Sequence, residues 1–337
     1  MIRDLITIVT HVVTQILGLW LPAPARVRVP ASDFAPSVLE RYQRFGASGL
    51  DSLAWLEFLE SSLSAFSDDL NWLHLLLKSR RIDLPNISQA AAKHFSAMES
   101  AGGKFMTIFD WNYPPLLRQI ARPPLVISML GDADLMVESV IAVIGSRRAS
   151  YEALHESVKI GQSCAREGMA VVSGGAIGCD IAVHEGMLST ASELVKAIVV
   201  MAGGLARLYP RSNVQTFDEI VDRGGLIISE RLWFQNVRPR DFPIRNRIVS
   251  GMSQCAIVMA ASKRSGSLIT ASEALEQGRD VYVYAGIGDD VRFEGSQNLI
   301  EDGATPFLSA SDLIPKIINN YINLTDIPGS IGLSYCQ

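Results

Sequence analysis

The sequence predicts an α/β protein in which a doubly wound, mostly parallel β-sheet follows a small all-α N-terminal domain. From residue 139 onward, short continuous apolar runs alternate with helix-like stretches, and Gly, Ser or Ala follows each run. Apolar runs joined by helices are typical of a parallel sheet covered on both faces. Before residue 105, apolar residues recur every three or four positions, which indicates amphipathic helices. A hydrophobic content of 48% with 19% charged residues excludes a disordered chain.

Three parts of the chain follow from these patterns. Residues 1–104 are predicted as the helical domain, residues 105–315 as the sheet domain and residues 316–337 as a short tail. Within the first part, we expect helices over 37–46, 50–66, 69–78 and 87–100 after a proline-rich linker at 22–36.

The apolar run at residues 5–21 is open to two interpretations. A Pro-Ala-Pro-Ala segment follows it, as at the cleavage site of a signal peptide. Polar residues from Thr7 to Gly18 nevertheless trace one stripe on a helix, and Asp4 cancels the charge of Arg3. We therefore expect an amphipathic helix packed within the protein or against a partner, and no membrane span. A membrane-surface or export role is the alternative.

Six apolar runs are predicted as the strands of the sheet. In parallel sheets, ligands bind beyond the carboxyl ends of the strands, where the strand order reverses. The loops at those ends should therefore converge on one site. The predicted strands span residues 140–144, 169–172, 197–201, 226–228, 256–259 and 281–284.

Three of these loops carry glycine and serine residues of the kind that hold phosphate. Backbone N–H groups in such turns, and the positive end of a helix dipole, attract anions. Tight turns with solvated arginines and plain helix capping are the structural alternatives. The candidates are Gly145, Ser146 and Arg147 after the first strand, Ser173, Gly174 and Gly175 after the second, and Ser265, Gly266, Ser267 and Thr270 at a helix start after the fifth.

A cluster of arginines marks residues 231–247. Five arginines fall within these seventeen residues, and Asp241 is the single acid among them, although the whole chain has a net charge of −5. The acidic balance excludes a uniformly basic nucleic-acid coat but allows a local basic patch. Arginine pairs with phosphate through a planar fork of donors; an ordinary surface cluster, or pairing of Arg245 with Glu230, is the alternative. The candidates are Arg238, Arg240, Phe242, Arg245, Asn246 and Arg247.

Other chemistries find less support. The four cysteines are far apart, so we expect neither a disulfide nor a metal site, and a cytoplasmic location is expected. The sequence contains neither a dinucleotide-binding fingerprint nor a Walker loop, and we expect no cofactor. Asp180 and His184 stand one helical turn apart and are expected to pair with each other; a catalytic role for the pair is the weaker hypothesis.

Taken together, these motifs resemble the DprA/Smf family of DNA-processing proteins. The resemblance runs from about Phe105 to Phe307. It rests on Tyr113-Pro-Pro-Leu-Leu117, Ile144-Gly-Ser-Arg147, Val172-Ser-Gly174 with Asp180 and His184, Tyr209-Pro210 with Asn213, Ser229-Glu230, Phe242-Pro243 with Arg245-Asn-Arg247, Ser265 through Ala271, and Gly295 with Asn298-Leu-Ile300 and Gly303-Ala304.

The resemblance implies an extended Rossmann-like domain that binds single-stranded DNA, protects it and loads a RecA-type recombinase onto it, as in natural transformation. It also implies a homodimer without enzymatic activity. By motif, Arg147 and residues 245–247 would line the phosphate-binding groove, and the arginine-rich loop before Phe242 would clasp the strand. Residues 40–46 resemble, more weakly, the small SAM-like helical domain of many members.

The chain also departs from the family pattern. Members commonly carry Arg at the position of Ile177 and Pro at that of Ala285. The loop before Phe242 lacks the Lys–aromatic pair that members often have, so Trp233 or Phe234 would have to supply a stacking ring there.

A second hypothesis is a nucleotide-binding sensor or a nucleoside-monophosphate phosphoribohydrolase of the same fold superfamily. Those enzymes place a Gly-Gly-x-Gly-Thr-x-x-Glu-like element at a helix start, which residues 265–267, Thr270 and Glu273 match imperfectly. Glu273 on the first turn of that helix would be the acid or base. A surface glutamate that stabilises the helix dipole is the alternative.

Overall fold

A computed structural model describes residues 93–94, 96–108, 110–263, 265–286 and 293–322. Two compact units contain them. One holds the described residues up to Leu130 with Gly203–Arg207 and Ser229–Val237, and the other holds Gly131–Ala202, Leu208–Ile228 and the described residues from Arg238 onward. The helix expected at residues 5–21, the other helices expected before residue 93 and the tail after residue 322 lie outside the described residues. The domain boundaries therefore stay proposals.

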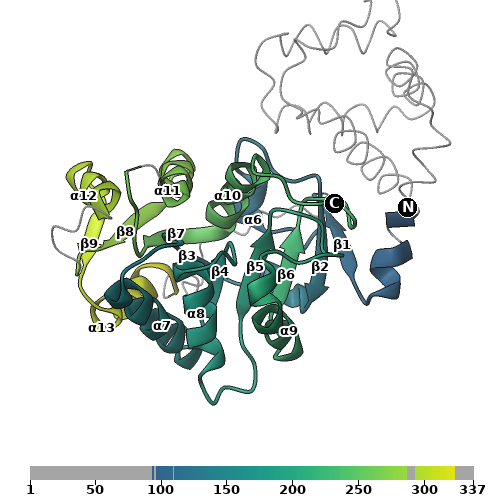
Figure 1. The fold of residues 1–337 in the computed structure, drawn as a ribbon, viewed down its shortest axis with the longest axis horizontal. Coiled ribbons are helices and arrows are strands. Elements are labelled where there is room, and N and C mark those ends of the chain that lie inside the picture. Colours follow the sequence, from purple (N-terminus) through teal and green to yellow (C-terminus); the bar gives the residue numbers. More distant parts are fainter. Residues whose placement is uncertain (1–92, 95, 109, 264, 287–292, 323–337) are drawn as a thin grey trace, which may run out of the picture. The chain divides into compact units, whose positions relative to one another are not determined.

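The second unit is built on a parallel sheet. Its strands follow one another in the order β6-β5-β4-β3-β7-β8-β9 (Figure 1). Five neighbouring pairs have a parallel register: β3 with β4 and β7, β4 with β5, and β8 with β7 and β9. The strands span Val140–Ile144 (β3), Ala170–Ser173 (β4), Ala197–Met201 (β5), Leu226–Ser229 (β6), Ser253–Val258 (β7), Asp280–Tyr284 (β8) and Thr305–Phe307 (β9).

All six predicted strands are present, and the α/β class with a mostly parallel, doubly wound sheet is confirmed. Every residue of β3 and β5 is buried, as expected for strands that helices cover on both faces. The short strand β9 was not predicted, because its three residues include a proline and only Phe307 is buried.

The strand order reverses beside β3. The chain adds β4, β5 and β6 in succession on one side of β3, then returns to place β7 on the other side and continues outward through β8 and β9. The connections after β3 and β7 therefore leave the sheet in opposite directions. A crevice opens between them at their carboxyl ends, where doubly wound sheets bind ligands.

Helices cover both faces of this sheet. Figure 1 shows α10 and α11 on one face and α7, α8 and α9 on the other. Two shorter helical turns, η3 and η4, lie in the connections between these elements, and η6 follows α13. The elements are η3 (Ala133–Val137), α7 (Tyr151–Arg166), α8 (Cys179–Leu188), η4 (Arg211–Asn213), α9 (Val214–Asp222), α10 (Asp241–Met252), α11 (Gly266–Glu276), α12 (Glu294–Glu301), α13 (Ala310–Ile317) and η6 (Ile318–Ile322).

Helices α7 and α8 approach closely because each has a glycine at the crossing. A Cβ atom at Gly161 would collide with the carbonyl oxygen of Val183, and one at Gly186 would collide with that of Val158. Helix α7 begins at a serine cap, in which Ser150 Oγ accepts a hydrogen bond from the Ala153 N–H at 3.2 Å. The close crossing holds the second half of α8 against α7.

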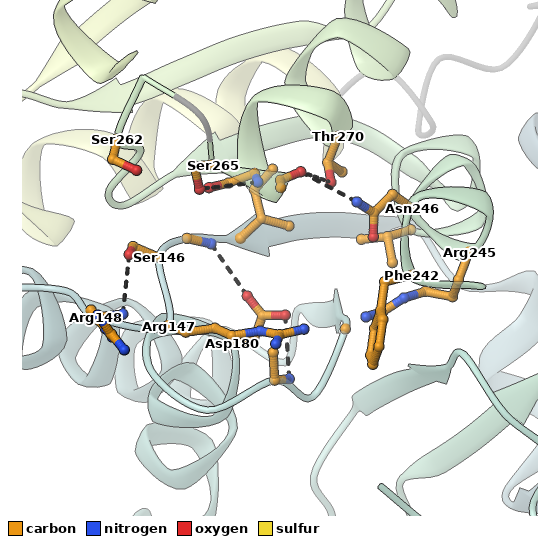
Figure 2. A pocket seen from close by; sticks show the side chains of 17 residues that line it. Ser146, Arg147, Arg148, Asp180, Phe242, Arg245, Asn246, Ser262, Ser265 and Thr270 are labelled. Atoms are coloured by element: carbon orange, nitrogen blue, oxygen red, sulfur yellow. Dashed lines mark hydrogen bonds between the residues drawn. The ribbon is translucent and has the colours of Figure 1, made fainter. Parts of the chain in front are cut away.

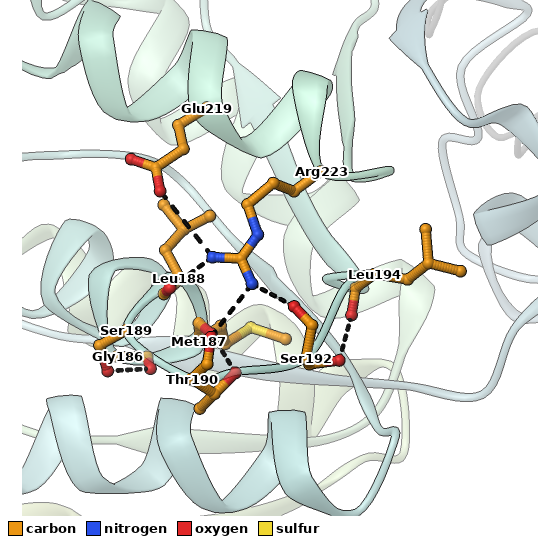
Figure 3. A network of polar contacts seen from close by, with 9 residues as sticks. All are labelled: Gly186, Met187, Leu188, Ser189, Thr190, Ser192, Leu194, Glu219 and Arg223. Carbon is orange, nitrogen blue, oxygen red and sulfur yellow. Dashed lines mark hydrogen bonds and ion pairs between the residues drawn. The ribbon is translucent and has the colours of Figure 1, made fainter.

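Arg223 fastens the loop that follows α8 (Figure 3). Its guanidinium donates hydrogen bonds to the carbonyl oxygens of Leu188, Thr190 and Ser192. Glu219, one turn earlier on α9, lies 3.9 Å from the Arg223 Nη1 atom. The end of α9 thereby supplies donors to the last carbonyl of α8 and to two carbonyls of the loop that follows it.

The first unit contributes an antiparallel pair of strands and a short helix. Strand β1 (Lys104–Thr107) pairs with β2 (Val126–Gly131), and α6 (Pro115–Arg118) lies between them in sequence. Tyr113 is buried and donates its hydroxyl hydrogen to the Pro124 carbonyl at 2.9 Å. Among the described residues of both units, no helix combines the length and apolar character that crossing a membrane requires.

Candidate functional site

A pocket of about 610 Å³ lies in the second unit, at the carboxyl ends of the strands. Its walls are the loops after β3, β4 and β7, one face of α10 and the first turn of α11 (Figure 2). The charged residues that line it are Arg147, Arg148, Arg245 and Asp180, so positive charge predominates. The reversal of the strand order, rather than any single motif, brings these loops together.

Eleven of the sixteen predicted site residues line this pocket, and five do not. The five are Ser173, Gly175, Arg238, Arg240 and Arg247. The eleven are Gly145, Ser146, Arg147, Gly174, Phe242, Arg245, Asn246, Ser265, Gly266, Ser267 and Thr270.

The arginines between residues 238 and 247 lie in three different environments. Arg238 and Arg240 are exposed in the turn before α10. Arg245 is 6% exposed and lines the pocket. Arg247 is only 2% exposed, and its Nη1 atom donates to the Ile244 carbonyl at 3.1 Å. The geometry therefore gives no support to the predicted part of Arg247 in phosphate binding and favours a structural role.

Helical spacing explains which residues of α10 reach the pocket. Phe242, Arg245, Asn246 and Val249 all line it. They stand at positions i, i+3, i+4 and i+7, which form one face of a helix. This spacing is visible in the sequence and would have excluded Arg247 and added Val249.

The guanidinium of Arg147 lies over the aromatic ring of Phe242 at the edge of the pocket. The guanidinium carbon of Arg147 lies 4.9 Å from the ring centroid of Phe242, within the range of a cation–π interaction. The ring of Tyr209, which is 45% exposed, lies 5.9 Å from the Phe242 ring on a tilted plane. Arg147 is itself exposed. A charged group and two rings are thus held together where a ligand can reach them.

A buried carboxylate ties two pocket loops together. Asp180 accepts hydrogen bonds from the Gly145 N–H at 3.2 Å and from the Ala176 N–H at 3.4 Å. Burial raises the pKa of Asp180, and the nearby charge of Arg245 opposes this shift. The sequence predicted that backbone amides after β3 would face a phosphate, but the Gly145 amide is already engaged by Asp180.

Arg245 lies against the backbone of Gly174. A Cβ atom at position 174 would overlap the Arg245 guanidinium, which explains the glycine. The Arg245 Nη1 atom donates to the Val200 carbonyl at 2.6 Å, so the alternative of a pairing with Glu230 is not what positions it. Burial lowers the pKa of Arg245 to about 10, which leaves it charged at neutral pH. Its Nε atom is buried and has no hydrogen-bond partner among the described residues.

The start of α11 forms the opposite wall. Ser265 Oγ caps the helix by accepting from the Ser267 N–H at 3.3 Å, so the capping interpretation is confirmed. Asn246 Nδ2 donates to the Gly266 carbonyl at 3.3 Å and joins α10 to α11. Capping does not exclude an anion here, because the helix dipole still places positive potential at this end.

The predicted pairing of Asp180 with His184 is wrong. Asp180 turns to the loop amides instead, and neither ring nitrogen of His184 has a hydrogen-bond partner among the described residues. His184 is fully buried, and its burial lowers its pKa to about 4. The histidine is therefore neutral at physiological pH.

Sequence reasoning missed Asp180 and Arg148 as pocket residues. An acidic residue in the first turn of a helix, immediately after Gly178, is the signal that could have placed Asp180 at the loops. The departure at Ile177 leaves an exposed apolar side chain on the same loop, outside the pocket lining.

The position of Glu273 gives no support to its proposed part as the acid or base of an enzyme. Glu273 is the eighth residue of α11 rather than a first-turn residue, and it is not among the residues that line the pocket.

Of the two rings considered for the loop before Phe242, Trp233 is buried at 6% exposure. Phe234 is 45% exposed and lies beside the His94 ring in the first unit.

Comparisons with known proteins agree on one family. Residues 104–318 match the family model described as DNA recombination-mediator protein A. The DNA processing protein DprA of Bacillus subtilis is 32% identical over 232 residues, which are 68% of this chain and 77% of the relative. Protein Smf of Escherichia coli is 31% identical over 297 residues, which are 83% of this chain and 78% of the relative.

Two solved structures share the fold. DNA processing protein A of Streptococcus pneumoniae superimposes with a TM-score of 0.63 at 30% identity, over 83% of this chain and 90% of the other. DNA processing protein A of Helicobacter pylori gives a TM-score of 0.58 at 26% identity, over 65% of this chain and 97% of the other. The Helicobacter structure is described as showing a single-stranded DNA binding mode.

Proposed function

Because the chain belongs to the DNA recombination-mediator protein A family, we propose that it binds single-stranded DNA in the pocket of its second unit and helps to load a RecA-type recombinase onto the bound strand. The family relationship supports the first part through the Helicobacter pylori relative, which binds single-stranded DNA. Recombinase loading, homodimer formation and a cytoplasmic location are further parts of the proposal.

The single observation that carries the proposal is the placement of Arg147 over Phe242 at the pocket. Arg147 is exposed, so its guanidinium can pair with a phosphate while it stays over the Phe242 ring. Phe242 offers a ring on which a base can stack, and Tyr209 extends this aromatic surface. Backbone neutralisation combined with base stacking is how proteins hold single strands without reading their sequence.

The pocket favours a single strand over a duplex. Its walls come from three loops and two helices that surround a volume of about 610 Å³. One flexible backbone with unstacked bases can enter such a space. A rigid duplex keeps its bases stacked inside and presents only phosphates to the pocket edge, so Phe242 would have no base to contact.

We therefore expect the full chain to bind a single-stranded oligonucleotide more tightly than a duplex of the same sequence. Fluorescence anisotropy titration over a range of salt concentrations measures both affinities. The logarithm of the association constant should fall linearly with the logarithm of salt concentration, with a slope of about −0.7 for each phosphate neutralised. Equal affinity for the two forms, or an affinity that salt does not change, would contradict the proposal.

The recombinase part needs its own measurement. Purified RecA-type recombinase should assemble faster on a single strand that this protein already covers than on a strand covered by a single-strand-binding protein alone. Filament assembly can be followed through recombinase ATP hydrolysis. An unchanged assembly rate would remove loading from the proposal and leave strand binding in place.

A further inference from the structure

The first two turns of α7 carry an exposed pair of stacked rings beside the pocket. The ring centroids of Tyr151 and His155 lie 5.8 Å apart, and the ring planes differ by only 7°. Tyr151 is 76% exposed, although an aromatic ring of this size is usually at least half-buried. The stack with His155 uses one face of the Tyr151 ring and leaves the remainder accessible to a ligand.

This pair is continuous with the pocket through Arg148. Arg148 lines the pocket, and Tyr151 follows it by three residues. The Arg148 N–H donates to Ser146 Oγ at 3.1 Å, and Ser150 caps the helix, so the backbone between pocket and helix is held in place. Figure 2 shows Arg147 extending toward Phe242, whereas Arg148 lies at the far end of the same loop.

We propose that Arg148, Tyr151 and His155 form a second stacking platform, which receives the nucleotides that leave the pocket on the side away from Phe242. The inference rests on the proposed function. In it, Arg148 neutralises a phosphate at the edge of the pocket, and the open face of the Tyr151 ring accepts the next base. Every base has a π-face, so such a platform lengthens the binding site without adding sequence preference.

The charges around the platform are compatible with a nucleic acid. The acidic residue nearest in sequence is Glu152, which is exposed. After burial, the charges of Glu156 and Glu152 are the causes that raise the pKa of Tyr284 on β8. Glu156 accepts hydrogen bonds from the Ala310 N–H and from Lys159. Glu156 thus serves the interior side of the helix, while Tyr151 and His155 face solvent.

The size of the platform argues for a nucleotide rather than a protein partner. Stable protein interfaces bury roughly 800 Å² on each partner and include some 20 residues or more. Two rings and one arginine fall far short of that area but match the contact that one or two nucleotides make. Their continuity with a pocket lined by cations identifies the occupant as the strand that already fills the pocket.

The experiment compares the wild-type chain with Tyr151→Ala on a series of single-stranded oligothymidylates of increasing length. With the wild type, affinity should rise with length until the strand fills both the pocket and the platform. Tyr151→Ala should bind the shortest oligonucleotides as the wild type does, but should bind the longer ones about tenfold more weakly, as expected for the loss of one stacked base. Tyr151→Phe keeps the ring and should restore the wild-type curve.

Two further variants sharpen the test. His155→Ala should show the same length-dependent loss, because the imidazole supports the Tyr151 ring. Trp111→Ala removes the most exposed aromatic ring among the described residues of the first unit and should change no affinity. Melting temperatures of all variants should match that of the wild type, because these side chains are exposed.

The outcomes separate this inference from the proposed function. If the wild type binds single strands and the affinity of Tyr151→Ala depends on length in the same way, the platform is overturned and the pocket proposal stands. A loss in Tyr151→Ala that is equal at every length also overturns it, because the ring would then belong to the pocket itself. Absence of single-strand binding by the wild type overturns both.

Discussion

Replacement of Arg245 by alanine should lower the free energy of unfolding by about 1–3 kcal/mol, the cost of leaving a buried polar or charged group without its partner. Arg245 and Asp180 are both buried, at 6% and 7% exposure. The charge of Arg245 is the strongest influence that favours ionised Asp180 against its burial. The variant would also lose the 2.6 Å hydrogen bond to the Val200 carbonyl. Chemical denaturation of the full chain measures the change.

A double replacement tests whether charge is the cause. Arg245→Met with Asp180→Asn removes both charges and keeps similar volumes, so it should be less destabilised than Arg245→Met alone. The loss in Arg245→Met should also shrink at acid pH, where protonation neutralises Asp180. If the free energy of unfolding of Arg245→Ala lies within about 0.5 kcal/mol of the wild-type value, the usual range for surface substitutions, this arginine does not stabilise the fold around the pocket.

Acidification should destabilise the protein through His184. Its folded pKa of about 4 lies below the ordinary value of 6.5 because of burial. The unfolded chain therefore binds a proton between these pH values, and the folded chain does not. The stability that neutral His184 contributes is fully present above pH 6.5 and is lost as the pH falls toward 4. At about 1.4 kcal/mol per pH unit, the loss reaches roughly 3 kcal/mol.

Comparison with His184→Leu isolates this effect. Leucine has no proton to gain, so the unfolding free energy of the variant should change less over the same pH range. Asp180, with its raised pKa, titrates in the opposite sense in acid but is present in both proteins. Parallel pH profiles for the wild type and the variant would mean that His184 is hydrated or paired in solution.

Hydrophobic patterning accounts for most of the described fold. The apolar runs at β3 and β5 are fully buried strands, and their ends could be placed from the sequence alone. The antiparallel β1 and β2 and the short β9 were not recognised. The exposed Lys104 and Pro306 interrupt the apolar pattern of β1 and β9.

The candidate site was predictable as a set of loops but not as a set of contacts. Parallel strands place their carboxyl ends at one edge, and this brought residues 145–147, Gly174 and the start of α11 together. Burial of arginine is less accessible to pattern analysis, since Arg245 and Arg247 read as surface charges until the packing of α10 is known. The engagement of the Gly145 amide by Asp180 joins residues 35 apart in sequence, and no local signal reports it.

The salt dependence of single-strand binding by Arg147→Ala tests the central claim most directly. Arg147 is exposed, so its replacement should leave the melting temperature unchanged and weaken binding by about 1.5–3 kcal/mol, the value of a charge-assisted hydrogen bond. Arg166→Ala, an exposed arginine in the last turn of α7, is the matched control and should bind as the wild type does. If Arg147 neutralises one phosphate, the log–log salt slope of Arg147→Ala should be shallower by about 0.7. An affinity and a slope equal to those of the wild type would show that the strand does not pass over this pocket.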